Sequence, residues 1–119
     1  MPIVYRLDTI QLMSAVDKLR ENGITVDLDS LRAIAASYSI VEIAVFGSSI
    51  RKDMAADSDV DLLITFSERA SVSLFDLMDL EERLSELFGR SVDIVEPDSL
   101  SNPVRRKAIL SSKETLYAA

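Results

Sequence analysis

The first third of the chain has the apolar spacing of two amphipathic helices. Asp8 followed by Gln11 is typical of a capping box at a helix start, and Asn22-Gly23 is typical of a helix end. A second helix is predicted to begin near Asp27 or Asp29. The expected buried stripe of the first helix is Leu12, Ala15, Val16 and Leu19, and that of the second is Leu28, Leu31, Ile34, Ala35 and Tyr38.

Three short apolar runs then predict strands. Residues 40–46 are apolar and rich in β-branched side chains, with Glu42 as their one charge. Residues 59–66 form a second run, and residues 92–95 form a third that Pro97 ends. Runs of this kind are typical of mostly buried strands.

Two more helices complete the predicted order. Ser73 with Asp76 begins one that Gly89 ends, and Asn102-Pro103 supplies an N-cap and a first-turn proline for the last. The order helix, helix, strand, strand, helix, strand, helix predicts an α/β (α+β) fold, in which helices pack on a small mixed sheet. The expected buried stripe of the helix that begins at Ser73 is Leu77, Leu80, Leu84, Leu87 and Phe88. The last helix carries Val104, Ala108, Ile109 and Leu110.

The residue types that the chain lacks narrow its chemistry. Cysteine and histidine are both absent, which excludes disulfides, histidine general bases and typical zinc centres. Any metal site must use oxygen ligands, and these favour Mg²⁺ or Mn²⁺. The formal net charge of −7 disfavours binding to a nucleic-acid template. We interpret the one basic cluster, Arg105-Arg106-Lys107, as a solvated helix face in preference to a binding patch.

The expected cellular location follows from the lack of a secretion signal and of a membrane-spanning segment in the sequence. Residues 1–8 lack the charged start and apolar core of a secretion signal. No apolar run approaches the roughly 20 residues that span a bilayer. We therefore expect a soluble, cytoplasmic protein without a membrane partner.

An Asp-x-Asp pair stands at the start of the second predicted strand. Residues two apart on a strand point to the same face, so Asp59 and Asp61 are expected to project together. Their like charges repel each other unless a cation lies between them. Asp93 is the lone charge in the third run, and a lone buried carboxylate is costly unless it is paired or binds a metal. If the two strands are neighbours, Asp93 completes a cluster of three carboxylates.

A turn of small residues follows the first predicted strand. Gly47 permits a positive φ and the close approach of a bulky anion. Ser48 can donate its hydroxyl and its backbone N–H to a phosphate. Residues 48–52 are predicted to begin a short helix, and Arg51 is the nearest cation that could neutralise a phosphate there.

Each of these features alone has an ordinary structural explanation. A Gly-Ser pair at a strand end is commonly just a turn, and Asp-x-Asp at a strand start is commonly a solvated rim. Asp93 alone fits a satisfied edge carboxylate, and Arg51 alone fits a surface residue. All of them occur in order and beside predicted strands, and this combination favours a site for a metal–nucleotide complex.

The spacing also resembles a known signature. Gly47-Ser48, ten further residues and Asp59-Val60-Asp61 are similar to the G-S-x10-D-x-D motif of the DNA polymerase β-like nucleotidyltransferases. The likeness is fullest for the minimal nucleotidyltransferases (MNT), whose motif has an arginine at the position of Arg51 and a serine at that of Ser58. Their third aspartate lies in a strand that resembles Val92-Asp93-Ile94-Val95.

The resemblance covers residues 40–118, and it implies the polymerase β-like nucleotidyltransferase fold. The stretch from Pro97 to Tyr117 resembles the C-terminal end of the family. Residues 1–38 carry no further motif and are expected to form an N-terminal helical extension. At 119 residues the chain has the length of one domain, so residues 1–119 are expected to form a single nucleotidyltransferase domain.

The resemblance implies a metal-dependent enzyme. Asp59 and Asp61 would bind two Mg²⁺ ions, for which Mn²⁺ could substitute, together with the triphosphate of ATP. Asp93 would help to hold the catalytic metal and to deprotonate an attacking hydroxyl. Gly47 and Ser48 would hold the terminal phosphates. Such catalysis consists of positioning and charge neutralisation and needs no histidine.

The resemblance also implies a partner. Minimal nucleotidyltransferases are often encoded beside a HEPN protein as toxin–antitoxin pairs. In such pairs the enzyme transfers AMP from ATP to a tyrosine of the HEPN ribonuclease toxin and silences it. An acidic chain suits a basic, RNA-binding partner, and a homo-oligomer is also compatible with the sequence.

Two departures from the family pattern leave nucleotide affinity and base preference open. Lys52 stands where many members have glycine, and Ser49 stands where many have a large residue. Two other functions stay open as well. The chain could neutralise a partner by stoichiometric binding without catalysis, which its apolar N-terminal helices would suit. It could also modify a small molecule such as an aminoglycoside, although such enzymes normally carry an additional acceptor domain.

Overall fold

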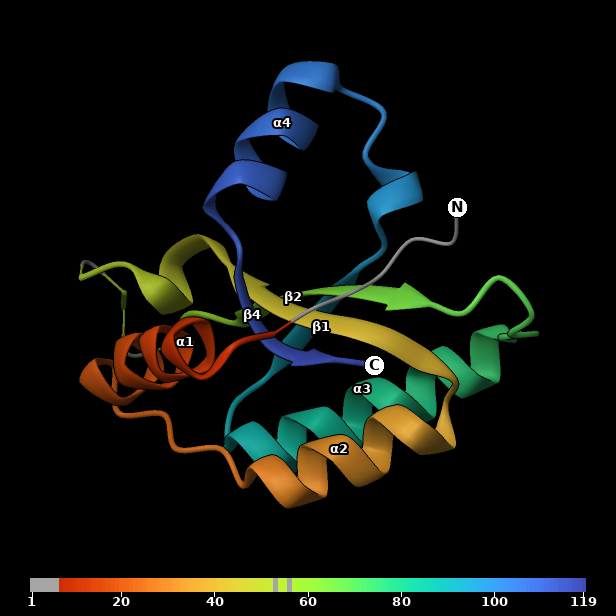
Figure 1. Cartoon of the computed structure of the whole chain (residues 1–119), viewed down its shortest axis with the longest axis horizontal. Coiled ribbons are helices and arrows are strands. Elements are labelled where there is room, and N and C mark those ends of the chain that lie inside the picture. The colour runs from red at the N-terminus through yellow and green to blue at the C-terminus, as the bar shows by residue number, and fades with distance from the viewer. Residues whose placement is uncertain (1–6, 53, 56) are drawn as a thin grey trace.

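The computed structural model describes residues 7–52, 54–55 and 57–119 (Figure 1). The expectation that residues 1–8 carry no secretion signal falls mostly on residues 1–6, which lie outside the described residues. Residues 53 and 56, in the loop between Gly47 and Asp59, also lie outside them. The helices are α1 (Thr9–Glu21), α2 (Leu28–Ser37), α3 (Leu74–Phe88) and α4 (Pro103–Ser112). The strands are β1 (Ile40–Phe46), β2 (Val60–Phe66), β3 (Val92–Val95) and β4 (Glu114–Ala118), and two 3-10 helices are η1 (Gly47–Ile50) and η2 (Pro97–Ser99).

The strands form one mixed sheet in the order β3-β2-β1-β4. β1 is antiparallel to both of its neighbours, and β2 is parallel to β3. The predicted class, a small mixed sheet packed with helices, is confirmed. β2 begins at Val60, so Asp59 precedes the strand in which the sequence pattern places it.

The sequence pattern does not predict the edge strand β4. Of its five residues only Leu116 is buried, so the segment lacks the apolar run that marks the other strands. Its place in the sheet depends on pairing with β1, for example between Glu42 and Ala118. Pairing between distant segments leaves no local signal in a sequence.

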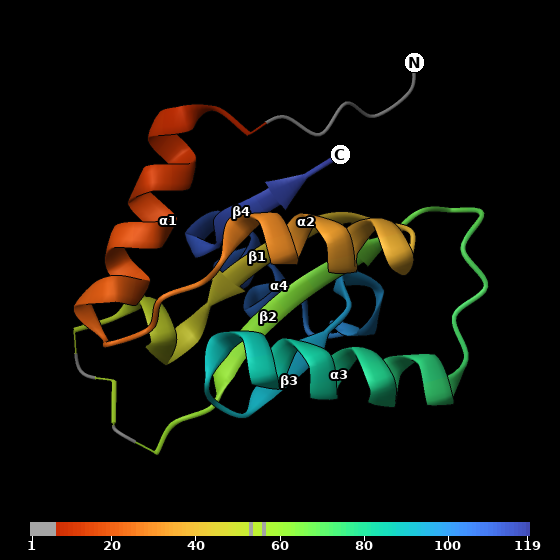
Figure 2. The same ribbon diagram turned by 90° about the horizontal axis from the view of Figure 1, so that it is seen from below.

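The sheet lies between two helical layers. α2 and α3 cover one face and α4 lies over the other, while α1 packs against β4 and η1 (Figure 1 and Figure 2). Alternate residues of β2 belong to different core clusters, as the pleat requires. Val60, Leu62 and Ile64 join the larger cluster with residues of α1, α2 and α3. Leu63 joins a smaller cluster with Ala44, Phe46, Leu100 and Ile109.

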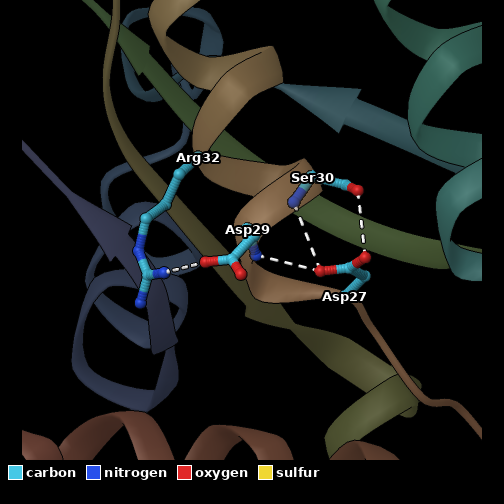
Figure 3. Close-up of polar contacts among 4 residues, drawn as sticks. All are labelled: Asp27, Asp29, Ser30 and Arg32. Carbon is cyan, nitrogen blue, oxygen red and sulfur yellow. Dashed lines mark hydrogen bonds and ion pairs between the residues drawn. The ribbon is translucent and has the colours of Figure 1, made fainter.

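The start of α2 shows which of two acidic residues caps it. Oδ1 of Asp27 accepts hydrogen bonds from the backbone N–H groups of Asp29, at 3.0 Å, and Ser30, at 3.4 Å (Figure 3). The hydroxyl of Ser30 donates to the other oxygen of Asp27 at 3.1 Å, and Arg32 pairs with Asp29 at 2.7 Å. Asp27 is therefore the N-cap, and a cap of this type stabilises a helix by about 1 kcal/mol.

The other predicted helix ends are confirmed, and α4 exposes most of the apolar residues that it carries. Capping boxes begin α1 and α3, Asn102 caps α4, and Gly89 ends α3 with a φ of +68°. In α4 only Ile109 is buried, and Val104 is 78% exposed. α4 meets the sheet through Ile109, which belongs to the small cluster that contains Phe46. In the described part of the chain, no helix combines the length and apolar character needed to span a membrane.

The one charged side chain of β1, that of Glu42, is buried, and its two partners are half-buried. Nζ of Lys113 lies 2.6 Å from Oε1 of Glu42, and the hydroxyl of Thr115 donates to Oε2 at 3.4 Å. Both partners come from the segment that ends α4 and begins β4. The buried carboxylate therefore joins β1 to the edge strand.

Candidate active site

The turn η1 begins at Gly47, the residue that follows β1. Gly47 has a φ of +73°, a left-handed conformation that residues with a side chain rarely adopt. A Cβ atom at this position would lie 2.6 Å from Oδ2 of Asp61. Phe46 is the register partner of Asp61, so strand pairing itself brings the turn against this carboxylate. Both backbone conformation and space therefore require glycine here.

The turn is held from two sides. Ser49 is fully buried, and its hydroxyl donates to the backbone carbonyl of Phe46 at 3.2 Å. The side-chain amide of Asn22 donates to the carbonyls of Ser49, at 2.8 Å, and Arg51, at 3.0 Å. Ser48 is half-buried in the same turn. Sequence reasoning assigns Asn22 only to a helix end, because its bonds depend on the packing of α1 against η1.

The three predicted carboxylates meet at the start of β2 and β3. Asp61 and Asp93 are register partners in this parallel pair, and Asp59 precedes β2 by one residue. Asp59 and Asp93 are exposed, whereas Asp61 is half-buried. The pKa of Asp61 is raised, first by burial and then by the negative charges of Asp93 and Asp59. The neighbouring strands therefore bring the carboxylates within range of mutual repulsion.

The chemistry of this edge suits a hard divalent cation. The three carboxylates offer only oxygen ligands, and a cation would offset the repulsion that raises the pKa of Asp61. Among residues 7–52, 54–55 and 57–119, no three acidic side chains are already gathered as closely as one ion requires. A cation would therefore have to draw in the exposed side chains of Asp59 and Asp93.

Two arginines face these carboxylates from other elements. The positive charges of Arg105, in α4, and Arg51, after η1, lower the pKa of Asp61 and so oppose the larger raising effects. Both arginines line a cleft of about 350 Å³ between η1 and α4. Phe46, Ile50 and Ile109 contribute to its apolar wall.

The basic cluster of α4 is not a uniform solvated face. Lys107 is exposed, as that interpretation predicts. Arg106 is half-buried and donates to the backbone carbonyl of Pro97, and Arg105 is exposed but lines the cleft. The solvated-face interpretation therefore fails for Arg106 and is incomplete for Arg105. The difference arises from the position of each side chain around the helix, which depends on how α4 docks.

A family model for the nucleotidyltransferase domain matches residues 28–116 of the chain. The match runs from α2 into β4 and includes every site residue that the sequence predicts. It begins one helix earlier than the resemblance over residues 40–118. α1 and Asn22, the residue that caps its C-terminal end, lie outside the match.

Named relatives and solved structures agree with this match. The chain is 38% identical over 80 residues to protein adenylyltransferase MntA of Thermococcus cleftensis, covering 67% of this chain and 76% of that protein. A solved structure provisionally described as a minimal nucleotidyltransferase is 36% identical, with a TM-score of 0.56 over 74% of this chain and 94% of that one.

A more distant structure shares the fold alone. It is the tri-AMPylated HEPN toxin of Shewanella oneidensis in complex with an MNT antitoxin, at 16% identity and a TM-score of 0.54. The likeness covers 85% of this chain and 73% of the other. Because the family match runs from α2 into β4 and two proteins above one-third identity share most of their own length with this chain, the chain belongs to the nucleotidyltransferase domain family.

Proposed function

We propose that this nucleotidyltransferase is a Mg²⁺-dependent protein adenylyltransferase, which transfers AMP from ATP to a tyrosine hydroxyl of a HEPN toxin and thereby acts as its antitoxin. The observation that carries the proposal is the pairing of Asp61 with Asp93 directly beside Gly47. This arrangement puts metal-binding groups next to a turn whose backbone can approach a phosphate.

The three carboxylates have distinct roles in the proposal. Asp59 and Asp61 hold two divalent cations, Mg²⁺ or in its place Mn²⁺, and Asp93 helps to hold the catalytic one. Cations bound there supply charge neutralisation of the triphosphate and Lewis acidity toward the attacking hydroxyl. Asp93 assists removal of the hydroxyl proton. The hydroxyl oxygen then bonds to the α-phosphorus, the bond to the bridging β-phosphate oxygen breaks, and pyrophosphate leaves with that electron pair.

In the proposal, the turn at Gly47 and Ser48 orients the terminal phosphates of ATP. The backbone of Gly47 and Ser48 and the hydroxyl of Ser48 bind the terminal phosphates, with the Arg51 guanidinium as the neighbouring cation. The bonds from Asn22 support this role, since they fix the carbonyls of the turn. Such a rigid turn holds the phosphates in position without reorganisation.

The comparisons support the choice of partner. The Thermococcus relative is named a protein adenylyltransferase, and the Shewanella complex contains an AMPylated HEPN toxin with its antitoxin. The net charge of −7 suits a basic, RNA-binding protein better than a nucleic-acid template. We place the protein in the cytoplasm with this partner, and a homo-oligomer is compatible with the proposal.

A second function has one observation in its favour. Ile10 and Met13 of α1 are 81% and 57% exposed, which suits a surface that binds a partner. The chain could then neutralise a toxin by stoichiometric binding alone. Nothing comparable favours transfer to a small molecule such as an aminoglycoside.

Replacement of both motif aspartates separates the two functions. We expect Asp59→Asn/Asp61→Asn to abolish transfer of labelled AMP from ATP to the purified toxin, and to abolish toxin neutralisation in cells. Asp57→Asn is the matched control, because Asp57 is an exposed carboxylate of the same loop. If the double variant forms the complex and still neutralises the toxin without AMP transfer, stoichiometric binding is the function.

A further inference from the structure

Three consecutive basic residues of α4 have three different environments. The side chain of Arg106 donates to Pro97, and Lys107 is exposed. Arg105 lines the cleft beside Gly47, and its guanidinium forms no hydrogen bond or ion pair with the described residues. An arginine that lines a cleft while its donors stay unused is available to a ligand.

The charged residues around Arg105 indicate that the ligand of this cleft is negatively charged. Arg51, the residue that follows η1, lines the same cleft, so two arginines from different elements border one space. A second cleft of about 340 Å³ lies at the other end of β2 and is lined by Glu68, Glu96 and Asp98. Of these two clefts in a chain with a net charge of −7, the cleft between η1 and α4 suits an anion better.

The position of the cleft indicates which anion. The cleft is lined by Gly47, and a Cβ atom built on Gly47 would lie 2.6 Å from Oδ2 of Asp61, so this end of the cleft lies beside one of the three carboxylates. Its wall of Phe46, Ile50 and Ile109 excludes water on one side, and exclusion of water strengthens an ion pair formed there.

We propose that Arg105 binds the β- and γ-phosphates of the nucleotide, from the side of the cleft opposite Arg51, and neutralises the pyrophosphate as it leaves. The inference rests on the proposed function, because it assigns one end of the same ATP site to α4. Guanidinium groups suit this role because their paired N–H donors match two phosphate oxygens. Arg105 and Arg51 would thus bind the β- and γ-phosphates from two different elements.

The role of Arg105 is tested by measuring the binding of ligands that contain or lack the β- and γ-phosphates. We expect Arg105→Ala to weaken Mg-ATP binding about tenfold or more by calorimetry, since a charge-assisted phosphate contact contributes at least that factor. Affinity for AMP, which has no β- or γ-phosphate, should change less than about twofold. Inorganic pyrophosphate should compete with ATP about tenfold less well in the variant than in the wild type. Arg105→Lys should show a smaller loss, because it keeps the charge without the paired donors.

Lys107→Ala is the matched control, since it removes one positive charge from the same helix away from the cleft. It should leave all three affinities unchanged. Thermal melting of Arg105→Ala should match that of the wild type, because the guanidinium has no bond to lose within the described chain.

The outcomes separate this inference from the proposed function. Equal ATP affinity in Arg105→Ala and Lys107→Ala, or an equal loss for ATP and AMP, would overturn the role of Arg105. A wild type that binds no ATP would overturn both. Normal ATP binding that Arg105→Ala weakens, without transfer to the toxin, would support Arg105 and overturn the proposed acceptor.

Discussion

The side-chain amide of Asn22 donates a 2.8 Å hydrogen bond to the backbone carbonyl of Ser49 and so joins the end of α1 to the turn after β1. A second bond, 3.0 Å long, reaches the carbonyl of Arg51. The family match begins at residue 28, so this support comes from a helix outside the matched region. α1 therefore takes part in shaping the candidate site, beyond being an extension of the domain.

We predict that Asn22→Ala lowers the free energy of unfolding by about 1–2 kcal/mol, because two carbonyls of the turn lose their donor. The turn should also loosen, so Mg-ATP affinity should fall while the global fold persists. Urea unfolding, calorimetry and hydrogen exchange of the amides at residues 48–51 measure these effects. Glu21→Ala is the control, because Glu21 is the exposed preceding residue. Unchanged exchange in the turn would show that the two bonds do not hold it.

Two glycines with almost the same backbone conformation allow the crowding at Gly47 to be isolated. Gly23 has a φ of +78° and Gly47 a φ of +73°, but a Cβ on Gly23 would meet nothing within 4 Å. We predict that Gly23→Ala costs roughly 1–2 kcal/mol from left-handed strain alone. Gly47→Ala should cost clearly more, because its methyl group collides with the Asp61 carboxylate. Paired urea unfolding curves give the difference.

A double-mutant cycle identifies the source of that difference. In an Asp61→Ala background the colliding oxygen is absent, so Gly47→Ala should cost about as much as Gly23→Ala. An undiminished cost in that background would assign the requirement for glycine to another contact. Loss of ATP binding in Gly47→Ala would separately support the role of the turn.

Local signals account for most of the secondary structure that the sequence predicts. Asp8 with Gln11, Ser73 with Asp76 and Asn102 all cap helices in the structure, because capping depends on residues three or fewer apart. β4 depends instead on pairing with a distant strand. It also carries a single buried residue, Leu116, and so gives no periodic signal.

The residues of the candidate site also fall into two groups, those that local sequence predicts and those that only tertiary packing brings together. The spacing of Gly47 and the two motif aspartates is local, and the sequence predicts it directly. The pairing of Asp93 with Asp61 is predictable only on condition that their strands are neighbours, which the sheet order confirms. Asn22 contacts the turn, and Arg105 lines the neighbouring cleft, through helix packing that the spacing of residues does not encode.

The buried Glu42 provides a test of how β4 is held. Glu42 and Lys113 side chains are 10% and 25% exposed and pair at 2.6 Å. Lys113→Ala leaves the carboxylate buried with the hydroxyl of Thr115 as its remaining donor among the described residues. We predict a loss of about 2–3 kcal/mol in urea unfolding, somewhat below the cost of breaking a fully buried pair.

A control for this prediction removes both charges. Glu42→Leu/Lys113→Leu should recover most of the lost stability, because the cost lies in an unpaired buried charge rather than in the missing attraction. Equal instability of the double and single variants would mean that the pair itself stabilises the β1–β4 edge.

The raised pKa of Asp61 predicts an unusual effect of removing its charge. Burial, Asp93 and Asp59 raise this pKa above that of the unfolded chain, so ionisation of Asp61 destabilises the folded state. The cost is present at pH values above the folded-state pKa and disappears as the pH falls below the unfolded value of about 3.9. With a chelator present, Asp61→Asn should therefore melt at a higher temperature than the wild type at pH 7. The gap should narrow as the pH approaches 4.

Addition of Mg²⁺ should act in the opposite direction under the proposed function. A cation held by Asp61 stabilises only the wild type, so the gap at pH 7 should shrink or change sign. Asp57→Asn serves as the control, because it removes a charge from the same loop without touching the proposed ligands, and its response to Mg²⁺ should equal that of the wild type. If Asp61→Asn melts lower than the wild type in chelator at pH 7, repulsion among the three carboxylates is not what governs this edge of the sheet. If the gap persists when Mg²⁺ is added, Asp61 does not bind the ion.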